Sequence, residues 1–379
     1  MSTADAPLIR LTSALIRAAG ENPGGTEAAT VDVLAGAAAS LGLQTRIDEV
    51  APGRQNISIT LPGGDGPGLL FLGHSDVVPA GPGWSRAPFS GAVVGDRVHG
   101  RGSSDMKGGL AAVLTAMGRL QRAGAQLSGP LTLACTVDEE DTGLGIRALV
   151  EAGLDHDYLG CVVAEPTDLQ TVIACRGDSY LEVTVTGVPA HSGRPADGRN
   201  AIDAAARVLM LLADDQHRLD DHADPLLGSG SWSTGRISGG HGTSMVAPNC
   251  SISLDRRLLP DEDPAAIAQT LLERIRQAGI TGDGIEVAID VSMEMPGFRT
   301  DAEHRLVRAA GGTPTGWTAA CDGGFVSRDL GIDCIILGPG GLNDQAHQVD
   351  ESVGIDELVT ATRRYEQLAL DLLGDEQAG

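Results

Sequence analysis

Short apolar runs alternate with longer amphipathic stretches along the N-terminal half of the chain, and this alternation restricts the possible folds most. The apolar runs fit buried β-strands, and the stretches between some of them fit helices that pack on a sheet. Strands that alternate with helices of this length are typical of α/β proteins with parallel strand pairs. The predicted strands cover 56–61, 68–72, 131–137 and 160–163, and the predicted helices cover 7–19, 26–42, 106–123 and 142–152.

A second pattern interrupts the first between residues 178 and 293. Strands and helices are predicted there in the order β-α-β-β-α-β, which is the order of the ferredoxin-like split unit. They cover 179–185, 200–213, 231–237, 251–257, 264–278 and 285–291, with a polar stretch at 214–230. The first pattern then resumes at 301–310, 333–337 and 355–373. We therefore predict a discontinuous first domain, 1–177 with 294–379, and an inserted domain, 178–293.

Charge and composition exclude several classes of protein. The chain of 379 residues has a formal net charge of −24, and Lys107 is its only lysine. Such an acidic chain repels a phosphate backbone, so we expect no nucleic acid partner. No segment has the roughly 18 to 20 apolar residues of a membrane span, so we expect no membrane association. The six cysteines include no CxxC pair, which favours reduced thiols and a cytoplasmic protein.

Residues of the kinds that bind zinc follow several predicted strands. His74 comes just after the strand 68–72, and Asp76 can accept the second imidazole proton and so fix the nitrogen that faces a metal. The two residues also fit an ordinary hydrogen-bonded pair. Glu165 follows another strand end and His347 lies in a late loop, where each taken alone also fits an ordinary surface position.

Asp105 lies on a glycine-rich loop immediately before the helix predicted from Met106. Its carboxylate can cap that helix, or it can bridge two cations because each of its oxygens can bind one. Capping does not require glycines on both sides of the aspartate. The flanking glycines indicate close backbone packing around this loop.

Four consecutive acids, residues 138–141, end the strand 131–137 and give the strongest single signal. Their mutual repulsion is costly unless cations or protons offset it. A solvated acidic turn is the alternative. If cations are present, the neighbours Glu139 and Glu140 can divide the work, one as a ligand and the other as the group that takes a proton from water.

These residue types are sufficient for a two-metal hydrolase site. Zinc binds nitrogen and oxygen donors at about 2.0–2.2 Å and keeps a position for water in catalytic sites. Two such ions about 3.5–4 Å apart, joined by a carboxylate, activate water and polarise a carbonyl together. Spacing alone does not show which of the residues converge.

Six motifs give the sequence a specific resemblance. They occur in the order HSDVVP, GRGSSDMKGG, DEED, AEPTD, GVPAHSGRP and GPGGLNDQAH. The ordered set resembles the family that contains acetylornithine deacetylase, succinyl-diaminopimelate desuccinylase, aminoacylase and carboxypeptidase G. The resemblance extends over most of the chain, from about His74 to Ser352. It implies an α/β zinc-peptidase-like catalytic domain, with a mixed sheet flanked by helices, and an inserted ferredoxin-like α+β lid and dimerisation domain.

The resemblance also implies a set of metal ligands. Two zinc ions are expected, with cobalt or manganese as possible substitutes. Asp105 is expected to bridge the two ions. His74 and Glu165 would complete one site, and Glu140 and His347 would complete the other.

Further roles follow from the same resemblance. Glu139 is implied as general base and Asp76 as the acid that orients His74. The peptide bond after the bridging aspartate is typically cis in the family, so we expect a cis bond after Asp105. His191 is expected to stabilise an oxyanion in the partner's site of a homodimer formed through the inserted domain. Arg257 is expected to bind a substrate carboxylate, for which bidentate arginine is well suited, although a surface charge is the alternative.

Two positions depart from the family pattern. Family members often carry asparagine where this chain has Met245, and arginine where it has Gly324. Both positions lie near the substrate in relatives. The departures leave the hydrolytic residues intact and place a standard acetylornithine or diaminopimelate substrate in question.

Rival classes fit the sequence less well. Gly73-His74-Ser75 begins like a serine hydrolase elbow, but Val77 stands where that motif needs glycine. The segment GRGSSD lacks the third glycine of a dinucleotide-binding fingerprint. Lys107 is followed by glycine, not by the Ser or Thr of a Walker motif. A non-catalytic binding protein would not need the complete ligand set. We expect a metal-dependent amidohydrolase that deacylates an N-acyl amino acid, with a dipeptidase or carboxypeptidase-type exopeptidase as the alternative.

Overall fold

The computed structural model describes residues 5–374 and divides them into two compact units. Within this range, unit 1 contains 5–173, 299–315 and 322–374, and unit 2 contains 174–298 and 316–321. The predicted inserted segment, 178–293, falls inside unit 2. The chain passes between the units within β8 (Val172–Cys175), β13 (Phe298–Arg299) and β14 (Thr315–Trp317).

Unit 1 is built on a mixed sheet, as the sequence predicts. Its other strands are β1 (Gln44–Ala51), β2 (Arg54–Leu61), β3 (Gly68–His74), β6 (Leu131–Thr136), β7 (Tyr158–Val163) and β15 (Cys334–Ile336). Their order is β1-β2-β6-β3-β7-β15-β8-β13, with β14 beside β8. β3 pairs in parallel with β6 and β7, and β15 pairs in parallel with β7. Because β3 and β6 are buried along their whole length, they read as continuous apolar runs.

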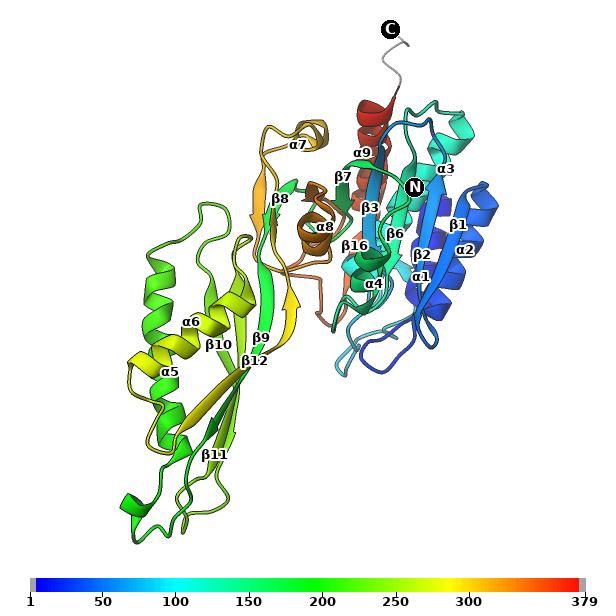
Figure 1. Ribbon diagram of the computed structural model, residues 1–379. Helices are drawn as coiled ribbons and strands as arrows, with labels where there is room; N and C mark the ends of the chain where they lie inside the picture. The colour runs from blue at the N-terminus through cyan, green and yellow to red at the C-terminus, as the bar shows by residue number, and fades with distance from the viewer. Residues whose placement is uncertain (1–4, 375–379) are drawn as a thin grey trace. The chain divides into compact units, whose positions relative to one another are not determined.

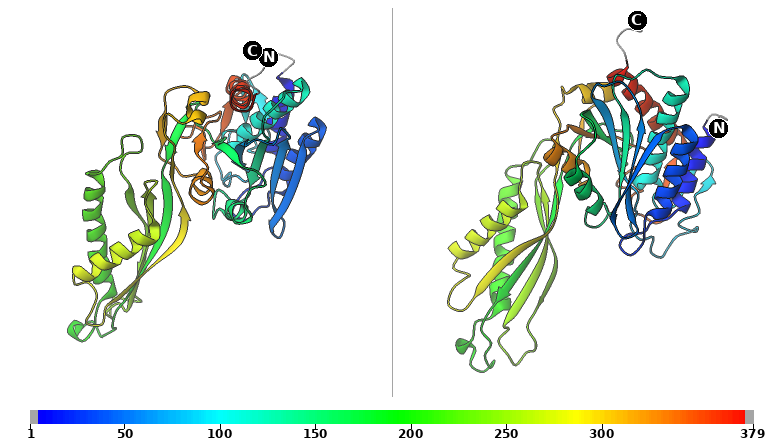
Figure 2. Two further views of the ribbon diagram at one scale, coloured as in Figure 1. Left: turned by 45° about the horizontal axis from the view of Figure 1, so that its top comes forward. Right: turned by 45° about the vertical axis from the view of Figure 1, so that its right-hand side comes forward.

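Helices cover both faces of this sheet (Figures 1 and 2). One face carries α1 (Ala6–Arg17), α2 (Ala28–Leu41), α3 (Gly108–Ala123) and α9 (Ile355–Leu373). The other face carries α4 (Leu144–Ala152) and α8 (Gly323–Leu330). The short helix α7 (Arg305–Ala310) contacts α9. A separate small sheet has the order β16-β5-β4 and contains β4 (Ala92–Val94), β5 (Arg97–His99) and β16 (Ser352–Gly354).

Unit 2 has the predicted β-α-β-β-α-β order. Its elements are β9 (Gly177–Thr186), a 3-10 turn (Pro195–Asp197), α5 (Ala201–Asp220), β10 (Ser231–Gly239), β11 (Asn249–Leu258), α6 (Pro264–Gln277) and β12 (Glu286–Met295). The strands form an antiparallel sheet in the order β10-β11-β9-β12. Alternate residues of β9 and β11 point into a core that they share with both helices, which explains the one-sided pattern of their sequences.

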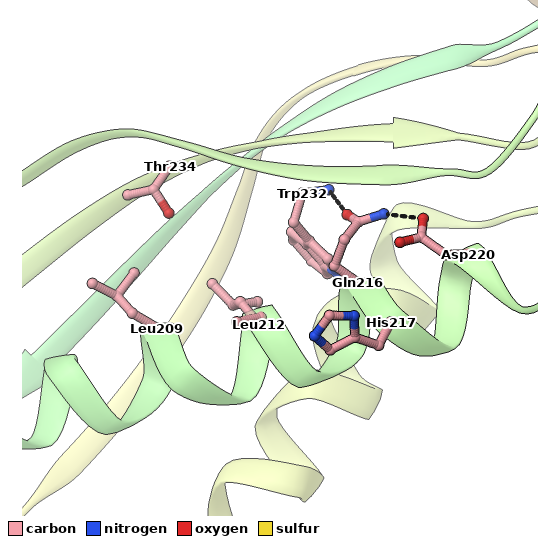
Figure 3. A pocket seen from close by; sticks show the side chains of 8 residues that line it. Leu209, Leu212, Gln216, His217, Asp220, Trp232 and Thr234 are labelled. Carbon is pink, nitrogen blue, oxygen red and sulfur yellow. Dashed lines mark hydrogen bonds between the residues drawn. The ribbon is translucent and has the colours of Figure 1, made fainter.

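The helix predicted over 200–213 is longer in the structure. α5 continues through residues assigned to a polar stretch and ends at Asp220. Polar side chains in this last part bond to β10 instead of to solvent alone: Gln216 accepts a hydrogen bond from the Trp232 amide at 2.9 Å (Figure 3). Asp215 accepts another from the Trp232 indole at 2.7 Å. Contacts with a neighbouring strand therefore stabilise a helical segment whose composition resembles a loop.

Other differences also have a local cause. β1 was not predicted because it is an edge strand whose residues are mostly exposed and polar. The helix predicted from Met106 begins at Gly108, after a π-turn over Ser103–Lys107 in which Asp105 and Met106 leave helical geometry. The expected cis bond between Asp105 and Met106 is confirmed. Among the described helices, none combines the length and apolar character needed to span a membrane.

Gly109 allows α3 to approach the end of β7 closely. A Cβ atom at Gly109 would lie 2.1 Å from the Ala164 carbonyl oxygen, whereas one at Gly36 in α2 would have nothing within 4 Å. We predict that Gly109→Ala lowers the free energy of unfolding by about 1–3 kcal/mol through overpacking. Gly36→Ala, the matched control, should raise it by about 0.5–1 kcal/mol. Urea unfolding measures both, and an unchanged midpoint for Gly109→Ala would contradict the close approach.

Candidate metal centre

The five candidate ligands come from five separate segments of unit 1. His74 is the last residue of β3, and Glu140 and Glu165 follow β6 and β7. Asp105 lies in the π-turn before α3, and His347 lies between β15 and β16. Because β3, β6, β7 and β15 run parallel, their carboxyl ends lie at one edge of the sheet. Open α/β sheets characteristically build their sites at that edge.

The structure brings these five side chains together in two groups that share Asp105. In the first group, His74 Nε2 lies 3.2 Å from Asp105 Oδ1 and 3.4 Å from Glu165 Oε1. In the second, His347 Nε2 lies 3.3 Å from Asp105 Oδ2 and 3.0 Å from Glu140 Oε2. Asp105 thus presents one carboxylate oxygen to each group.

The geometry of both groups fits a small divalent cation. Tetrahedral ligands about 2.0–2.2 Å from an ion lie roughly 3.3–3.6 Å from one another, close to the separations found here. Glu140 Oε1 is also buried without a hydrogen-bond partner. A buried carboxylate oxygen is costly unless a hydrogen bond or a cation compensates it. The donor set, two imidazoles and three carboxylates, is one that zinc accepts.

Comparison with known proteins identifies the family. The model of peptidase family M20/M25/M40 matches residues 70–371, which is most of the chain. The chain belongs to this family. It is therefore a metal-dependent hydrolase.

Relatives of the M20 chain include both deacetylases and peptidases. An acetylornithine deacetylase from Vibrio cholerae is 30% identical over 331 residues, which cover 84% of each protein. An aminopeptidase, PepT, from Bacillus cereus has a similar fold with a TM-score of 0.78 at 22% identity, covering 97% of this chain and 98% of that one. A dinuclear metal-binding peptidase of the M20 family from Bacillus subtilis has a TM-score of 0.74 at 16% identity, covering 98% of each chain.

Asp76 connects two of the segments of the M20 chain that carry candidate ligands. His74 Nδ1 lies 3.0 Å from the Asp76 carbonyl oxygen and 3.4 Å from its carboxylate, so the main chain makes the closer contact. In a neutral ring, donation from Nδ1 leaves the lone pair of Nε2 for a cation. The Asp76 carboxylate also accepts hydrogen bonds from the amides of Glu139 and Glu140 at 3.3 and 3.2 Å. Asp76 thereby fixes the backbone that carries the two glutamates.

Asp138, the first of the four acids after β6, is held by hydrogen bonds inside unit 1. Asp138 is buried with a φ of 69° and accepts hydrogen bonds from Arg54 Nη1 at 2.7 Å and Asn22 Nδ2 at 2.9 Å. Asn22 donates a second hydrogen bond to Asp76 at 2.9 Å. Neither Asn22 nor the anchoring role of Asp138 is predicted from the sequence. The segment Asn22-Pro23-Gly24-Gly25 is typical of a turn, but its composition does not indicate which distant group Asn22 contacts.

His191 and Arg257 belong to unit 2. His191 lies in an exposed loop, where its Nδ1 accepts a hydrogen bond from the Gly193 amide at 3.0 Å. Arg257 lies on β11, and its guanidinium is 3.0 Å from Asp255 and 3.2 Å from Asp178. A substrate carboxylate at Arg257 would therefore compete with two carboxylates of the same unit.

Proton affinities in the M20 chain reflect the crowding of acids. Burial and the nearby Asp105 raise the pKa of Glu165 to about 8. Hydrogen bonds to Asp105 and Glu140 raise the pKa of His347 to about 10. Burial also raises the pKa of Glu139 well above the usual range. In the chain without metal, protons thus supply part of the positive charge that the carboxylates require.

We predict that metal uptake releases these protons. At pH 7 both His347 and Glu165 hold a proton in the metal-free chain because their pKa values lie near 10 and 8, and ligands must lose their protons to bind a cation. Zinc added to metal-free protein should release more than one proton per chain at pH 7. The release should decrease as the pH rises through 8 towards 10. Calorimetry in buffers of different ionisation enthalpy measures the release, and a pH-independent value would contradict the prediction.

Proposed function

We propose that the chain hydrolyses the amide bond of a small substrate that carries a carboxylate, by deacylating an N-acyl amino acid. The two donor groups that share Asp105 carry this proposal, because each receives one oxygen of the same carboxylate. The acetylornithine deacetylase relative at 30% identity favours deacylation over peptide cleavage. An exopeptidase or dipeptidase would use the same centre and is the alternative.

The proposed ligands divide between two zinc ions. Asp105 would be shared, with His74 and Glu165 on one side and Glu140 and His347 on the other. Cobalt or manganese would be accepted by the same oxygen and nitrogen donors. When bound, the ions supply Lewis acidity for the amide carbonyl and lower the pKa of water.

Glu139 is the proposed general base and acid. Its backbone is fixed beside Glu140 through the Asp76 carboxylate. Burial raises the pKa of Glu139, which favours a group that takes a proton and then returns it. In the proposed reaction, Glu139 removes a proton from the attacking water and delivers it to the nitrogen of the leaving amine.

Unit 2 contributes substrate contacts in this proposal. We propose that the chain forms a homodimer through unit 2 and that His191 of each protomer stabilises the oxyanion in its partner's site. Arg257 would bind the substrate carboxylate in exchange for one of its present acidic partners. The buried thiols of Cys135, Cys161 and Cys175 fit a reducing compartment such as the cytoplasm.

Two positions argue for a substrate other than acetylornithine. Met245, where relatives often have asparagine, is an exposed residue of unit 2. Gly324, where relatives often have arginine, is buried in the first turn of α8. Neither residue offers a hydrogen-bonding side chain. We therefore propose an N-acyl amino acid whose side chain needs no polar partner from these two positions.

We predict the order of reactivity in a substrate screen. Zinc-loaded protein should hydrolyse N-acetyl or N-succinyl amino acids with apolar side chains at a higher kcat/KM than N-acetylornithine or free dipeptides. An ornithine ammonium that leaves water without a polar partner costs binding free energy, so N-acetylornithine should be hydrolysed less efficiently by roughly tenfold or more. Release of free amine from each substrate measures this. Faster cleavage of dipeptides would overturn deacylation in favour of the alternative.

We predict that Glu139→Gln lowers kcat by about 10²–10⁴-fold, because the amide cannot accept the proton. Metal content should stay at two ions per chain, since Glu139 is not a proposed ligand. Glu151→Gln, at an exposed position of α4, is the matched control and should leave kcat unchanged. Full turnover by the Glu139 variant would contradict its role.

The same variant tests the contribution of His191. Mixing Glu139→Gln chains with His191→Ala chains gives heterodimers in which one site has both functional groups. With random pairing, the mixture should recover about a quarter of wild-type turnover, although each parent is nearly inactive. A mixture as inactive as its parents would count against sharing across the dimer.

A further inference from the structure

Arg101 and Glu351 form a buried ion pair beside the metal centre that the proposed reaction does not use. Arg101 follows β5, and Glu351 comes directly before β16. The two side chains are 4% and 0% exposed, and Arg101 Nη1 lies 2.8 Å from Glu351 Oε2. A buried ion pair seldom adds net stability over a well-packed apolar pair. A gain in stability therefore does not explain this pair. Its hydrogen bonds to neighbouring backbone groups indicate a different role.

Glu351 holds the turn that carries Asp105. Its Oε1 accepts hydrogen bonds from the amides of Ser104 at 2.8 Å and Asp105 at 3.1 Å. Its Oε2 accepts another from the Gly102 amide at 3.0 Å. Together with Arg101, four donors saturate this carboxylate. The position of the shared ligand is thus fixed by a residue that lies far away in sequence.

Arg101 holds the loop that carries His347. Its Nη2 donates to the His347 carbonyl oxygen at 3.3 Å, and its Nη1 donates to the Gln348 carbonyl oxygen at 3.2 Å. The Arg101 guanidinium also lies over the Trp84 ring, 5.2 Å from its centroid. One planar cation therefore bonds to the His347 loop and, through Glu351, to the Asp105 turn.

His347 depends on such support more than the other ligands do. Its side chain is 52% exposed, whereas those of the other four are 1–10% exposed. It lies in a loop that contains no strand or helix between β15 and β16. Close packing therefore does not hold it in place, and the main-chain hydrogen bond from Arg101 replaces that packing.

We propose that Arg101 and Glu351 are positioning residues that join the Asp105 turn to the His347 loop and so preorganise the Asp105–Glu140–His347 half of the metal centre. This inference rests on the proposed ligand set. The hydrogen bonds from the pair to these two candidate ligands run through backbone atoms, the His347 carbonyl oxygen and the Asp105 amide. Arg101 bonds directly to the His347 loop and reaches the Asp105 turn only through Glu351, whose three amide donors do not depend on Arg101. Loss of Arg101 should thus weaken one ion selectively.

Titration of metal-free protein with Zn²⁺, followed by calorimetry, tests the proposal. Wild-type chains should bind two ions. For Arg101→Met, the affinity for one ion should fall by about 10–100-fold, the usual effect of losing a group that orients a ligand, while the affinity for the other stays within about threefold of wild type. Glu351→Gln, which keeps the size but places an amide against backbone donors, should weaken both ions. Equal affinities in Arg101→Met and wild type would overturn the proposal.

A matched control is available in unit 2. Arg256 is buried, pairs with Glu262 at 2.5 Å and lies 5.4 Å from the Trp232 ring centroid, so its surroundings resemble those of Arg101. Arg256→Met should bind both ions as wild type does. An equal loss of metal affinity in this variant would show a general effect of removing a buried arginine and would also overturn the proposal.

Two further measurements separate the possible failures. If Arg101→Met does not fold, Arg101→Lys keeps the charge but cannot span the acceptors. In that variant, amide hydrogen exchange of the full-length chain should be faster at 345–351, and unchanged exchange there would contradict the proposal. If wild-type protein binds fewer than two ions, the proposed ligand set itself is wrong. Wild-type protein with two ions and an unaffected Arg101→Met variant refutes only the positioning role.

Discussion

Repulsion between buried carboxylates is the constraint on which this structure depends. Asp105, Glu140 and Glu165 gather at one edge of a sheet with Asp76 beside them, and their side chains are at most 10% exposed, which is costly for a carboxylate unless hydrogen bonds or positive charges compensate it. The carboxylates fall into two groups that compensate this cost in different ways. Some receive hydrogen bonds from the protein on both oxygens, and others keep at least one oxygen directed towards the centre. The second group requires protons or cations. The stability of this part of the fold is therefore coupled to the binding of protons or metal ions.

Asp76 and Glu351 are the acids of the first group that organise the centre. Asp76 accepts hydrogen bonds from the amides after β6, and Glu351 accepts them from the turn before α3. Each anchors a loop that bears ligands while its own charge is satisfied by hydrogen bonds. Backbone amides are well suited to this task because they cannot change rotamer. The candidate ligands can therefore stay close together before any cation arrives, which is the preorganisation that the proposed two-metal site needs.

Sequence reasoning could predict the candidate ligands better than the residues that support them. His74 and Glu165 follow apolar strands, and such strands have a recognisable pattern. Asn22, Asp138 and Glu351 act by hydrogen bonds to groups distant in the chain, and such bonds leave no periodic signal. The same reason explains the missed end of α5, which is stabilised by contacts with Trp232 rather than by its own composition. Even the ligands could be grouped only by resemblance to a family, since spacing does not encode which strand ends meet.

The two halves of the candidate metal centre are held in place by different kinds of interaction. His74 pairs with Thr136 at the end of β3, and Glu165 follows the end of β7 by two residues, and both side chains are buried. His347 belongs to an irregular loop and is half exposed. A loop that must supply a ligand needs a connection to the scaffold, and a single arginine can provide it because its planar group donates to several acceptors at once. Lysine could not do so from the same position, and this chain has arginine there. In our proposal, the less buried half of the centre is thus the one whose geometry depends on an individual side chain, Arg101, as well as on the sheet.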